Sequence, residues 1–494
     1  MKVLLTSVFF LLMLHGSPLL GQKAPQNTSD SIDIFIKGKM DQLRIPGLQL
    51  GVIRNGKIEK LTNYGLANIE HHTATQSKTV FSINSMTKAF VGVAILQLQE
   101  QGQLNIDDPI SKYFTDIPNE WKPITLKQLL SNTSGLPNNI DEKEQVLGDG
   151  TEEKNWEIVR KRPMEFVPGS QFSYNQTGYY ILGRIITQLS GKHFTQFIED
   201  NQFKPCKMLV TQFGDSNDII ENSAGAYSTI INKDGKWIND GSLHIAFASF
   251  PVFFRTATGI ISSAEDISKW LIALQEGKLL KSEKSVKQLF TTIPLNNGSI
   301  GGFNKLTNGY ALGWPTVVRS EHPAAAPVGG MRSALFVYPE DHLSIIVLTN
   351  LQGSNPEWFI DEIAGYYIPD MKIENGFRLS RNMKLLHHQI IQDGYQNIEK
   401  AYQKIQKKQK KFKVSEEEVN TWGYQLMGRN LKDKALQVFK LNTILFPNSS
   451  NVYDSYGEIL DGLGYQKEAI INYKKSLQLN PGNTNAADYL KNKR

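Results

Sequence analysis

The sequence is poor in cysteine and in charge of one sign. Cys206 is the only cysteine in 494 residues, so the chain cannot form an internal disulfide. No motif with a base lies near Cys206, and we expect a small buried side chain rather than a nucleophile. The 54 Lys and Arg residues outnumber the 48 Asp and Glu residues only slightly. The lysine cluster at 404–413 therefore predicts a solvated helix face and no nucleic-acid partner.

The N-terminus carries an apolar stretch that is too short to span a membrane. Residues 3–14 follow Met1 and Lys2, and Gly16-Ser17-Pro18 interrupts the apolar pattern. A spanning helix needs about 20 apolar residues, whereas a short charged start before a shorter apolar core is typical of a secretory signal peptide. We predict a signal peptide at 1–21, with no transmembrane or lipoprotein anchor. The protein is then exported, to the periplasm or outside the cell.

Clusters of metal ligands are also missing from the sequence. His71-His72 and His387-His388 are adjacent pairs, whose side chains point apart on a strand or a helix. Neither pair has a third ligand nearby in the sequence. The sequence therefore predicts no metal site and no cofactor.

One tetrapeptide places a nucleophile beside a base. Ser85-Met86-Thr87-Lys88 precedes residues 89–98, which are apolar on nearly all sides and predict a buried helix. Residues three apart share a helix face, so Lys88 lies beside Ser85. Burial and the helix dipole both disfavour the charged amine, and a neutral amine can accept the Ser85 proton. Alone, the tetrapeptide would better fit a helix cap followed by a surface lysine.

A second block places a phenol before another helix. Residues 168–179 read PGSQFSYNQTGY, and the apolar helical pattern of residues 180–186 follows. With the Ser85 block, this stretch resembles the serine β-lactamase-related family, which includes penicillin-binding proteins, class C β-lactamases and related esterases and peptidases. The resemblance covers residues 30–365 and includes further blocks at 102–110, 129–136, 258–266 and 329–333.

The resemblance implies a role for each of these residues. Ser85 would attack an acyl carbon, while Lys88 and Tyr174 would share the general-base and general-acid work. Backbone N–H groups of Ser85 and of a residue near Gly330 would hold the oxyanion, with Gly329 beside it. The active site would lie between the edge of a sheet and an all-helical subdomain.

Several positions depart from the family pattern. Gln176 replaces the usual Asn of the tyrosine motif, and Asn132 replaces a common His, a change that we expect to be structural. The third motif, usually Lys-Thr-Gly or His-x-Gly, reads Pro327-Val328-Gly329. Proline removes the side chain that would recognise a substrate carboxylate in β-lactam-binding relatives. His322 or Arg332 is left as the candidate replacement, although His322 also fits an ordinary loop histidine.

Two hairpin patterns indicate the fold. Residues 48–61 have strand-forming residues on both sides of Asn55-Gly56, and residues 339–342 separate two further strand patterns. Hairpins at both ends of a mainly helical segment predict an α/β (α+β) domain, with one antiparallel sheet packed against helices. We assign residues 22–375 to this domain.

The C-terminal part contains an internal repeat with helical spacing. Four positions recur 34 residues later: Gly423, Ala435, Phe439 and Pro447 return as Gly457, Ala469, Tyr473 and Pro481. The period and the residue types resemble tetratricopeptide repeats. We assign the repeats to 414–494 and a helical linker or partial repeat to 376–413. Each repeat buries its inner face against a neighbour, so two repeats need support from further helices.

Three functions are compatible with these patterns. The favoured one is an exported serine hydrolase that cleaves a small ester, amide or peptide bond through an acyl-enzyme on Ser85. A β-lactamase or D,D-peptidase would use the same nucleophile but needs the carboxylate contact that Pro327 does not provide. A non-catalytic module that presents the repeats to a protein or peptide partner would not need Ser85, Lys88 and Tyr174 together.

Overall fold

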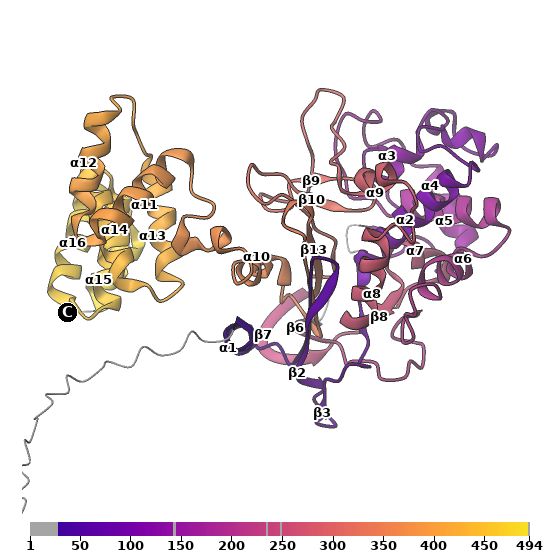
Figure 1. Cartoon of the computed structure of the whole chain (residues 1–494), viewed down its shortest axis with the longest axis horizontal. Helices are drawn as coiled ribbons and strands as arrows, with labels where there is room; N and C mark the ends of the chain where they lie inside the picture. Colours follow the sequence, from indigo (N-terminus) through magenta and orange to yellow (C-terminus); the bar gives the residue numbers. More distant parts are fainter. Residues whose placement is uncertain (1–27, 142–144, 234–235, 248, 493–494) are drawn as a thin grey trace, which may run out of the picture.

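The computed structural model describes residues 28–141, 145–233, 236–247 and 249–492. The predicted signal peptide lies outside these residues. The described chain forms an N-terminal domain, residues 28–379, and a C-terminal helical region, residues 380–492 (Figure 1).

A nine-stranded sheet is the centre of the N-terminal domain. The strand order is β3-β2-β1-β14-β13-β11-β10-β9, with β12 paired to β13. The strands are β1 Gly47–Arg54, β2 Lys57–Asn68, β3 Thr73–Ala74, β9 Gly309–Tyr310, β10 Pro315–Val317, β11 Ala324–Ala325, β12 Val328–Gly329, β13 Ser333–Tyr338 and β14 Leu343–Thr349. Both predicted hairpins are confirmed. Asn55 and Gly56 turn with φ values of 50° and 71°, the left-handed geometry that an Asn-Gly hairpin needs.

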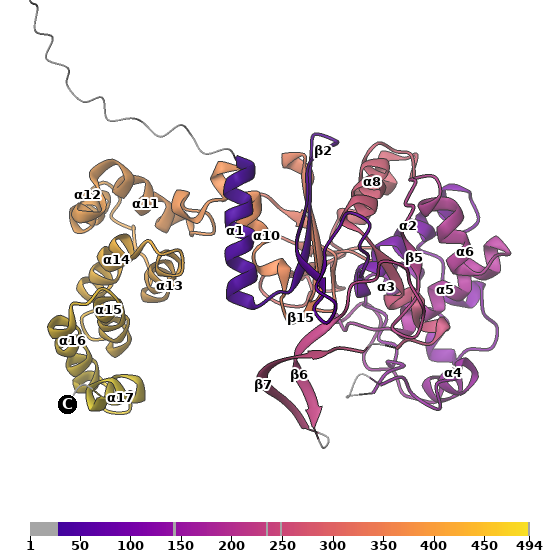
Figure 2. The same ribbon diagram turned by 90° about the horizontal axis from the view of Figure 1, so that it is seen from below.

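Helices cover both faces of the sheet. In Figure 2, α1 (Thr28–Leu43) and α10 (Ile360–Ala364) lie on one side, and α8 (Ala264–Gln275) lies on the other. Ile32 and Ile36 of α1 belong to the same buried cluster as Ile360. Trp270 of α8 belongs to a second buried cluster on the opposite face. The expected sheet packed against helices is therefore present.

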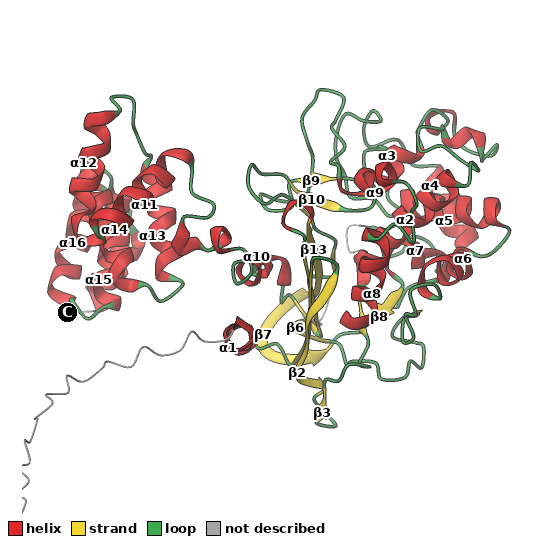
Figure 3. Cartoon of the chain, in the orientation of Figure 1, coloured by secondary structure: helices red, strands yellow, loops and turns green. Residues whose placement is uncertain are grey.

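An all-helical subdomain adjoins the α8 side of the sheet (Figure 3). Its helices are α2 Thr87–Glu100, α3 Leu126–Leu130, α4 Glu152–Arg160, α5 Thr177–Ser190, α6 Phe194–Ile198, α7 Arg255–Thr258 and α9 Glu283–Phe290. Every α2 residue from Thr87 to Leu98 is buried, as the apolar pattern predicts. Two small sheets complete the domain: β4 Phe81–Ser82, β5 Gln212–Phe213 and β8 Ile260–Ser262 form one, and β6 Tyr227–Lys233, β7 Lys236–Ile245 and β15 Leu351–Gln352 form the other.

The C-terminal helical region consists of packed helix pairs. Its helices are α11 Arg381–Asp393, α12 Ile398–Lys408, α13 Glu416–Met427, α14 Lys432–Leu445, α15 Ser450–Gly462, α16 Gln466–Leu479 and α17 Thr484–Asn492. The pair α13–α14 and the pair α15–α16 start 34 residues apart. Gly423 allows close approach, because a Cβ there would lie 2.6 Å from the Phe439 ring. Helices α11 to α15 share one buried cluster, which extends from Met383 to Ile459.

Charged side chains join the two parts. Between them, Lys384 of α11 is paired with Glu321. Within the N-terminal domain, Asp361 of α10 accepts hydrogen bonds from Arg319 at 2.7 and 3.0 Å and is also paired with Arg378. Arg429 of the helical region lies 3.2 Å from Glu362 and 3.4 Å from Glu374. No helix in the described part of the chain combines the length and the apolar character required to cross a bilayer.

Candidate active site

Ser85 lies in a short 3-10 turn, η1 (Asn84–Met86), that leads into α2. Its side chain is partly exposed, while Met86 beside it is 1% exposed. Asn84 has a left-handed backbone, with φ of 49°, and its amide donates to the Ser82 carbonyl at 3.1 Å. Asparagine tolerates this conformation better than a branched residue. The turn thus holds the Ser85 hydroxyl at the start of a buried helix.

Lys88 is almost completely buried one helical turn after Ser85. Its side chain is 1% exposed, and Nζ donates to the Ala257 carbonyl at 2.9 Å. The same Nζ lies 4.7 Å from the centre of the Tyr174 ring and 5.0 Å from that of Tyr179. Burial lowers the pKa of Lys88 well below its ordinary value of 10.5. A neutral amine in this position has a lone pair with which to accept a proton.

Tyr174 lies just before α5, in a loop that other side chains fix. Its ring packs edge to face on Phe303, with centroids 4.9 Å apart, and lies 6.5 Å from Tyr310. The backbone N–H of Asn175 donates to the Asn132 side chain at 3.0 Å. Asn132, where the family pattern has histidine, therefore anchors the loop that carries Tyr174.

Gln176 follows in the same loop. Its backbone N–H donates to Asn138 Oδ1 at 3.1 Å. Its own Oε1 is buried and has no hydrogen-bond partner among the described residues. A buried acceptor without a donor costs about 1–3 kcal/mol. The oxygen is enclosed by protein atoms, so a change of side-chain rotamer is needed to present the Gln176 amide to a ligand.

Gly329 of the third motif and the following Gly330 pack against the turn that carries Ser85. A Cβ on Gly329 would lie 2.0 Å from the Ile83 carbonyl, and a Cβ on Gly330 would lie 2.5 Å from Asn84 Nδ2. Ser333 Oγ donates to the same Ile83 carbonyl at 2.9 Å. Only glycine fits this close contact between β12 and η1. The structure thus brings Gly329 and Gly330 against the residues immediately before Ser85.

Arg332 is a buried cation beside the same turn. It is 7% exposed, and Nη2 donates to Asn84 Oδ1 at 3.3 Å, while Nε has no partner among the described residues. Burial lowers the pKa of Arg332 to about 10, so the guanidinium is charged at neutral pH. Arg332 also lines a cavity of about 310 Å³ together with Asp215 and Asp218, and none of the residues that line this cavity is Ser85, Lys88 or Tyr174. The guanidinium therefore keeps an N–H group without an acceptor among the described residues.

Comparison with known proteins agrees with this arrangement. The family described as Beta-lactamase matches residues 32–365, about two thirds of the chain. The chain belongs to the Beta-lactamase family. This family consists of serine hydrolases, and the solved structures similar to the chain include an amidase and a hydrolase with acyltransferase activity.

Individual relatives of this Beta-lactamase family member are distant. Protein flp of Staphylococcus aureus (strain MW2) is 28% identical over 339 residues, which are 66% of this chain and 64% of that protein. The putative penicillin-binding protein PbpX of Bacillus subtilis (strain 168) is 31% identical over 242 residues, 49% of this chain and 57% of that protein. The octameric penicillin-binding protein homologue from Pyrococcus abyssi has a TM-score of 0.59 at 24% identity, over 72% of this chain and 81% of that one. D-amino acid amidase from Ochrobactrum anthropi has a TM-score of 0.58 at 20% identity, over 69% and 99%. These last two likenesses show the Beta-lactamase fold alone.

The structure does not bring His322 to the site. Its Nδ1 lies 2.9 Å from Asp341 Oδ1, beside the turn between β13 and β14. Ser333, which contacts the Ile83 carbonyl, lies at the opposite end of β13. The six residues of this strand separate the two ends by about 16 Å. His322 is therefore a paired loop histidine, and Arg332 is the candidate that lies beside η1.

Two features of this Beta-lactamase site were not predicted from the sequence. The Ala257 carbonyl, which accepts the hydrogen bond of Lys88, directly precedes the family-like block at 258–266, and this position is the one available signal. Phe303, which packs on Tyr174, comes from a glycine-rich loop whose sequence gives no signal of its place.

Proposed function

We propose that the chain is an exported serine hydrolase that cleaves a small ester, amide or peptide bond through an acyl-enzyme on Ser85. One observation carries the proposal: Lys88 is buried, has a lowered pKa, and lies one helical turn from Ser85 and 4.7 Å from the Tyr174 ring centre. A structural lysine gains nothing from such a place, because burial of an amine without a carboxylate partner costs free energy.

The proposed reaction moves one proton in each half. Neutral Lys88 takes the Ser85 hydroxyl proton while Oγ bonds to the acyl carbon, and the carbonyl oxygen becomes an oxyanion. The oxyanion then collapses, the bond to the leaving group breaks, and the leaving group receives a proton from Lys88 or Tyr174. Water attacks the acyl-enzyme, returns a proton by the same route, and releases the acid and free Ser85.

The oxyanion and the substrate need polar contacts around Ser85. Backbone N–H groups of Ser85 and of a residue near Gly330 are the proposed oxyanion donors, which is supported by the contact of Gly330 with Asn84. The buried, unpartnered Oε1 of Gln176 is suited to a substrate N–H group. This feature favours an amide or peptide over a simple ester as the natural substrate.

Arg332 is the proposed recognition residue for an anionic group of the substrate. Its guanidinium is buried, charged and without a carboxylate partner in the described chain, and it donates to Asn84, the residue before Ser85, at 3.3 Å. Arg332 thereby takes the place of the third-motif side chain that Pro327 lacks. A charge-assisted hydrogen bond of this kind contributes about 1.5–3 kcal/mol.

A second candidate function is a β-lactamase or D,D-peptidase, and Arg332 is the observation that favours it. Penicillins and D-Ala-D-Ala peptides carry a carboxylate, and Arg332 is the buried cation beside η1. The third alternative, a non-catalytic binding module, does not require the desolvated Lys88.

Two further proposals concern the ends of the chain. Residues 1–21 form a cleaved signal peptide, on the strength of their charged start and short apolar core. Residues 414–494 form tetratricopeptide-like repeats that bind a protein or peptide partner. The 34-residue spacing of the helix pairs, and the contacts of Gly423 with Phe439 and of Gly457 with Tyr473, support the second proposal.

A covalent labelling experiment tests the proposed reaction. A fluorophosphonate probe should label the wild-type protein and fail to label Ser85→Ala. Ser190→Ala, which removes a partly exposed serine hydroxyl on α5, is the matched control and should label fully. Labelling of Ser85→Ala at the wild-type rate would place the nucleophile elsewhere. Rapid labelling by a fluorescent penicillin, with negligible ester turnover, would favour the second candidate function.

A further inference from the structure

A cavity in the all-helical subdomain lies apart from the catalytic candidates. Its volume is about 640 Å³, and none of the residues that line it is Ser85, Lys88 or Tyr174. Its walls come from α5, from the N-terminal end of α4 and from η5 (Val252–Phe254). Sites for small molecules commonly have volumes of about 300–1,000 Å³.

Arg184 of α5 is the cation of this cavity. Its guanidinium carbon lies 4.9 Å from the centre of the Phe114 ring, 5.1 Å from that of Trp156 and 5.8 Å from that of Tyr180. In the described chain, no carboxylate lies within ion-pair distance of Arg184. Arg160 differs in this respect, because it stacks on the same Trp156 ring and pairs with Asp116 at 2.6 Å. Aromatic stacking fixes the plane of Arg184 and leaves N–H groups at its edge for an acceptor.

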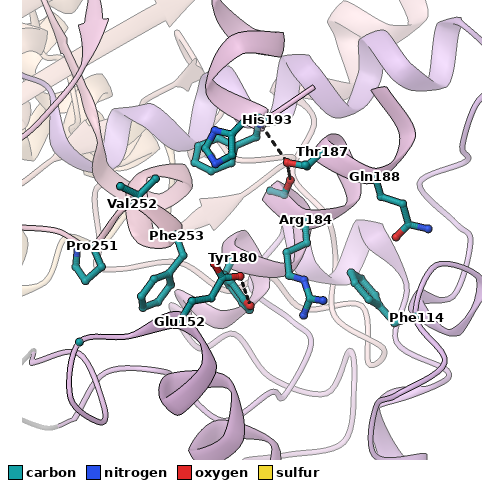
Figure 4. Close-up of a pocket in the computed structure, with 13 residues that line it drawn as sticks. Phe114, Glu152, Tyr180, Arg184, Thr187, Gln188, His193, Pro251, Val252 and Phe253 are labelled. Atoms are coloured by element: carbon teal, nitrogen blue, oxygen red, sulfur yellow. Dashed lines mark hydrogen bonds between the residues drawn. The ribbon is translucent and has the colours of Figure 1, made fainter. Parts of the chain in front are cut away.

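Glu152 supplies the opposite charge in the same cavity. The Tyr180 hydroxyl donates to Glu152 Oε1 at 2.8 Å and orients the carboxylate. No described lysine, arginine or histidine lies within ion-pair distance of Glu152. Tyr180 and Arg184 are one turn apart on α5, so Arg184 and Glu152 both act on the Tyr180 hydroxyl and line one cavity without forming a direct ion pair. Figure 4 shows Arg184 between the Phe114 side chain and the Tyr180–Glu152 pair.

The third wall of the cavity is apolar. Phe253 packs edge to face on Tyr180, with ring centroids 5.7 Å apart, and Pro251 and Val252 lie next to it in Figure 4. Val252 is 53% exposed, so an apolar group placed here would remove hydrophobic surface from water.

The geometry points to a binding site for a free amino acid with an apolar side chain. The α-carboxylate binds Arg184, the α-ammonium group binds Glu152, and the side chain covers Val252 and Phe253. An unpaired cation and an unpaired anion in one pocket match a zwitterion better than a ligand with a single charge. The site is separate from the proposed acyl-enzyme chemistry and does not depend on it.

Calorimetric titration of the full-length protein tests this site with three probes of similar shape. L-leucine carries both charges, 4-methylpentanoate lacks the amine, and 3-methylbutylamine lacks the carboxylate. We expect saturable binding of leucine and weaker binding of the other two. Arg184→Gln should weaken leucine and 4-methylpentanoate by roughly tenfold or more, the value of one charge-assisted contact. Glu152→Gln should weaken leucine and 3-methylbutylamine but leave 4-methylpentanoate unchanged.

Two controls separate the site from general effects. Arg160→Gln removes a stacked arginine that already has a partner, and leucine affinity should stay at the wild-type value. Ser85→Ala should also bind leucine normally, and ester turnover by Arg184→Gln should equal that of the wild type. Absence of leucine binding, unchanged affinity in both Arg184→Gln and Glu152→Gln, or loss of binding in Ser85→Ala would each overturn the assignment.

Discussion

Replacement of Lys88 by methionine separates the chemical role of the amine from its role in packing. Methionine has a similar length and fills the same buried space, but it cannot accept a proton. We expect ester turnover to fall by a factor of about 10² to 10⁴, the usual contribution of a positioned general base. The folded structure should persist, since Lys88 contributes a single hydrogen bond to the Ala257 carbonyl at 2.9 Å.

The same substitution has a calculable effect on the free energy of unfolding. An unfolded lysine has a pKa near 10.4, and the pKa of the buried amine is lowered. Between these two pKa values a neutral Lys88 costs about 1.4 kcal/mol of folding free energy for each pH unit below 10.4. Methionine removes this cost but leaves the Ala257 carbonyl without its donor, a loss of about 1–3 kcal/mol. Over the same pH range, the variant should therefore gain stability relative to the wild type as the pH falls.

The dependence on pH gives the sharper test. Burial lowers the pKa of Lys88 in the folded protein. The unfolded chain therefore binds the additional proton, and wild-type stability decreases as the pH falls toward the folded-state pKa. The variant lacks this effect, so its advantage should grow by about 1.4 kcal/mol for each unit from pH 9 downward. Urea unfolding at two or three pH values would measure the difference.

Lys60→Met is the matched control for this measurement. Lys60 is also buried, with a side chain 8% exposed, but it pairs with Asp33 at 2.7 Å. Its replacement should destabilise the protein, because it removes the ion-pair partner of Asp33. A stability difference for Lys88→Met that stays constant with pH would mean that the folded protein holds a charged Lys88. Another group would then have to accept the Ser85 proton, because a charged Lys88 has no lone pair.

Three further predictions concern the site and the domain boundary. Tyr174→Phe should lower turnover by a factor of about 10² to 10⁴, and wild-type steady-state rates in this variant would remove the phenol from the mechanism. Arg332→Met should lower kcat/KM about 10- to 100-fold for at least one of two anionic esters. p-Nitrophenyl hemisuccinate carries its carboxylate on the acyl group, and 3-acetoxybenzoate carries it on the leaving group. The neutral p-nitrophenyl acetate should be unaffected, and equal loss on all three esters would contradict the anion site. A chain that ends after Leu379 should keep ester turnover. Residues 414–494 alone should give no cooperative helical melt by circular dichroism, because eight of the 17 buried residues of their shared core precede Val414.

Local patterns account for much of what the sequence predicts correctly. The hairpin at Asn55-Gly56 depends on a turn whose two central residues adopt a positive φ, which asparagine and glycine tolerate. The helix after Ser85 depends on a long apolar run. Because Ser85 and Lys88 lie three positions apart, helix geometry alone places them together. The helix pairs near Gly423 follow from the 34-residue repeat in the same way.

Contacts between distant segments could not be predicted. Lys88 binds the Ala257 carbonyl 169 residues away, and Arg332 contacts Asn84 across 248 residues. The choice between His322 and Arg332 depends on which end of β13 faces η1, and no local pattern encodes this orientation. The ion pairs of Asp361 with Arg319 and Arg378 likewise join segments that only the folded domain brings together.

The ion pairs of Arg429 with Glu362 and Glu374 affect how firmly the helical region is held on the N-terminal domain. The buried cluster of α11 to α15 shares no residue with the clusters of the N-terminal domain, while Arg429 reaches Glu362 and Glu374 across the boundary. Partly exposed ion pairs each contribute about 0–1 kcal/mol, and 1 M salt screens them within about 3 Å. High salt should therefore weaken the attachment of the helical region to the N-terminal domain. A protein that bound the helical region, as proposed above, would change its orientation on the N-terminal domain at the cost of these ion pairs and not of either buried core.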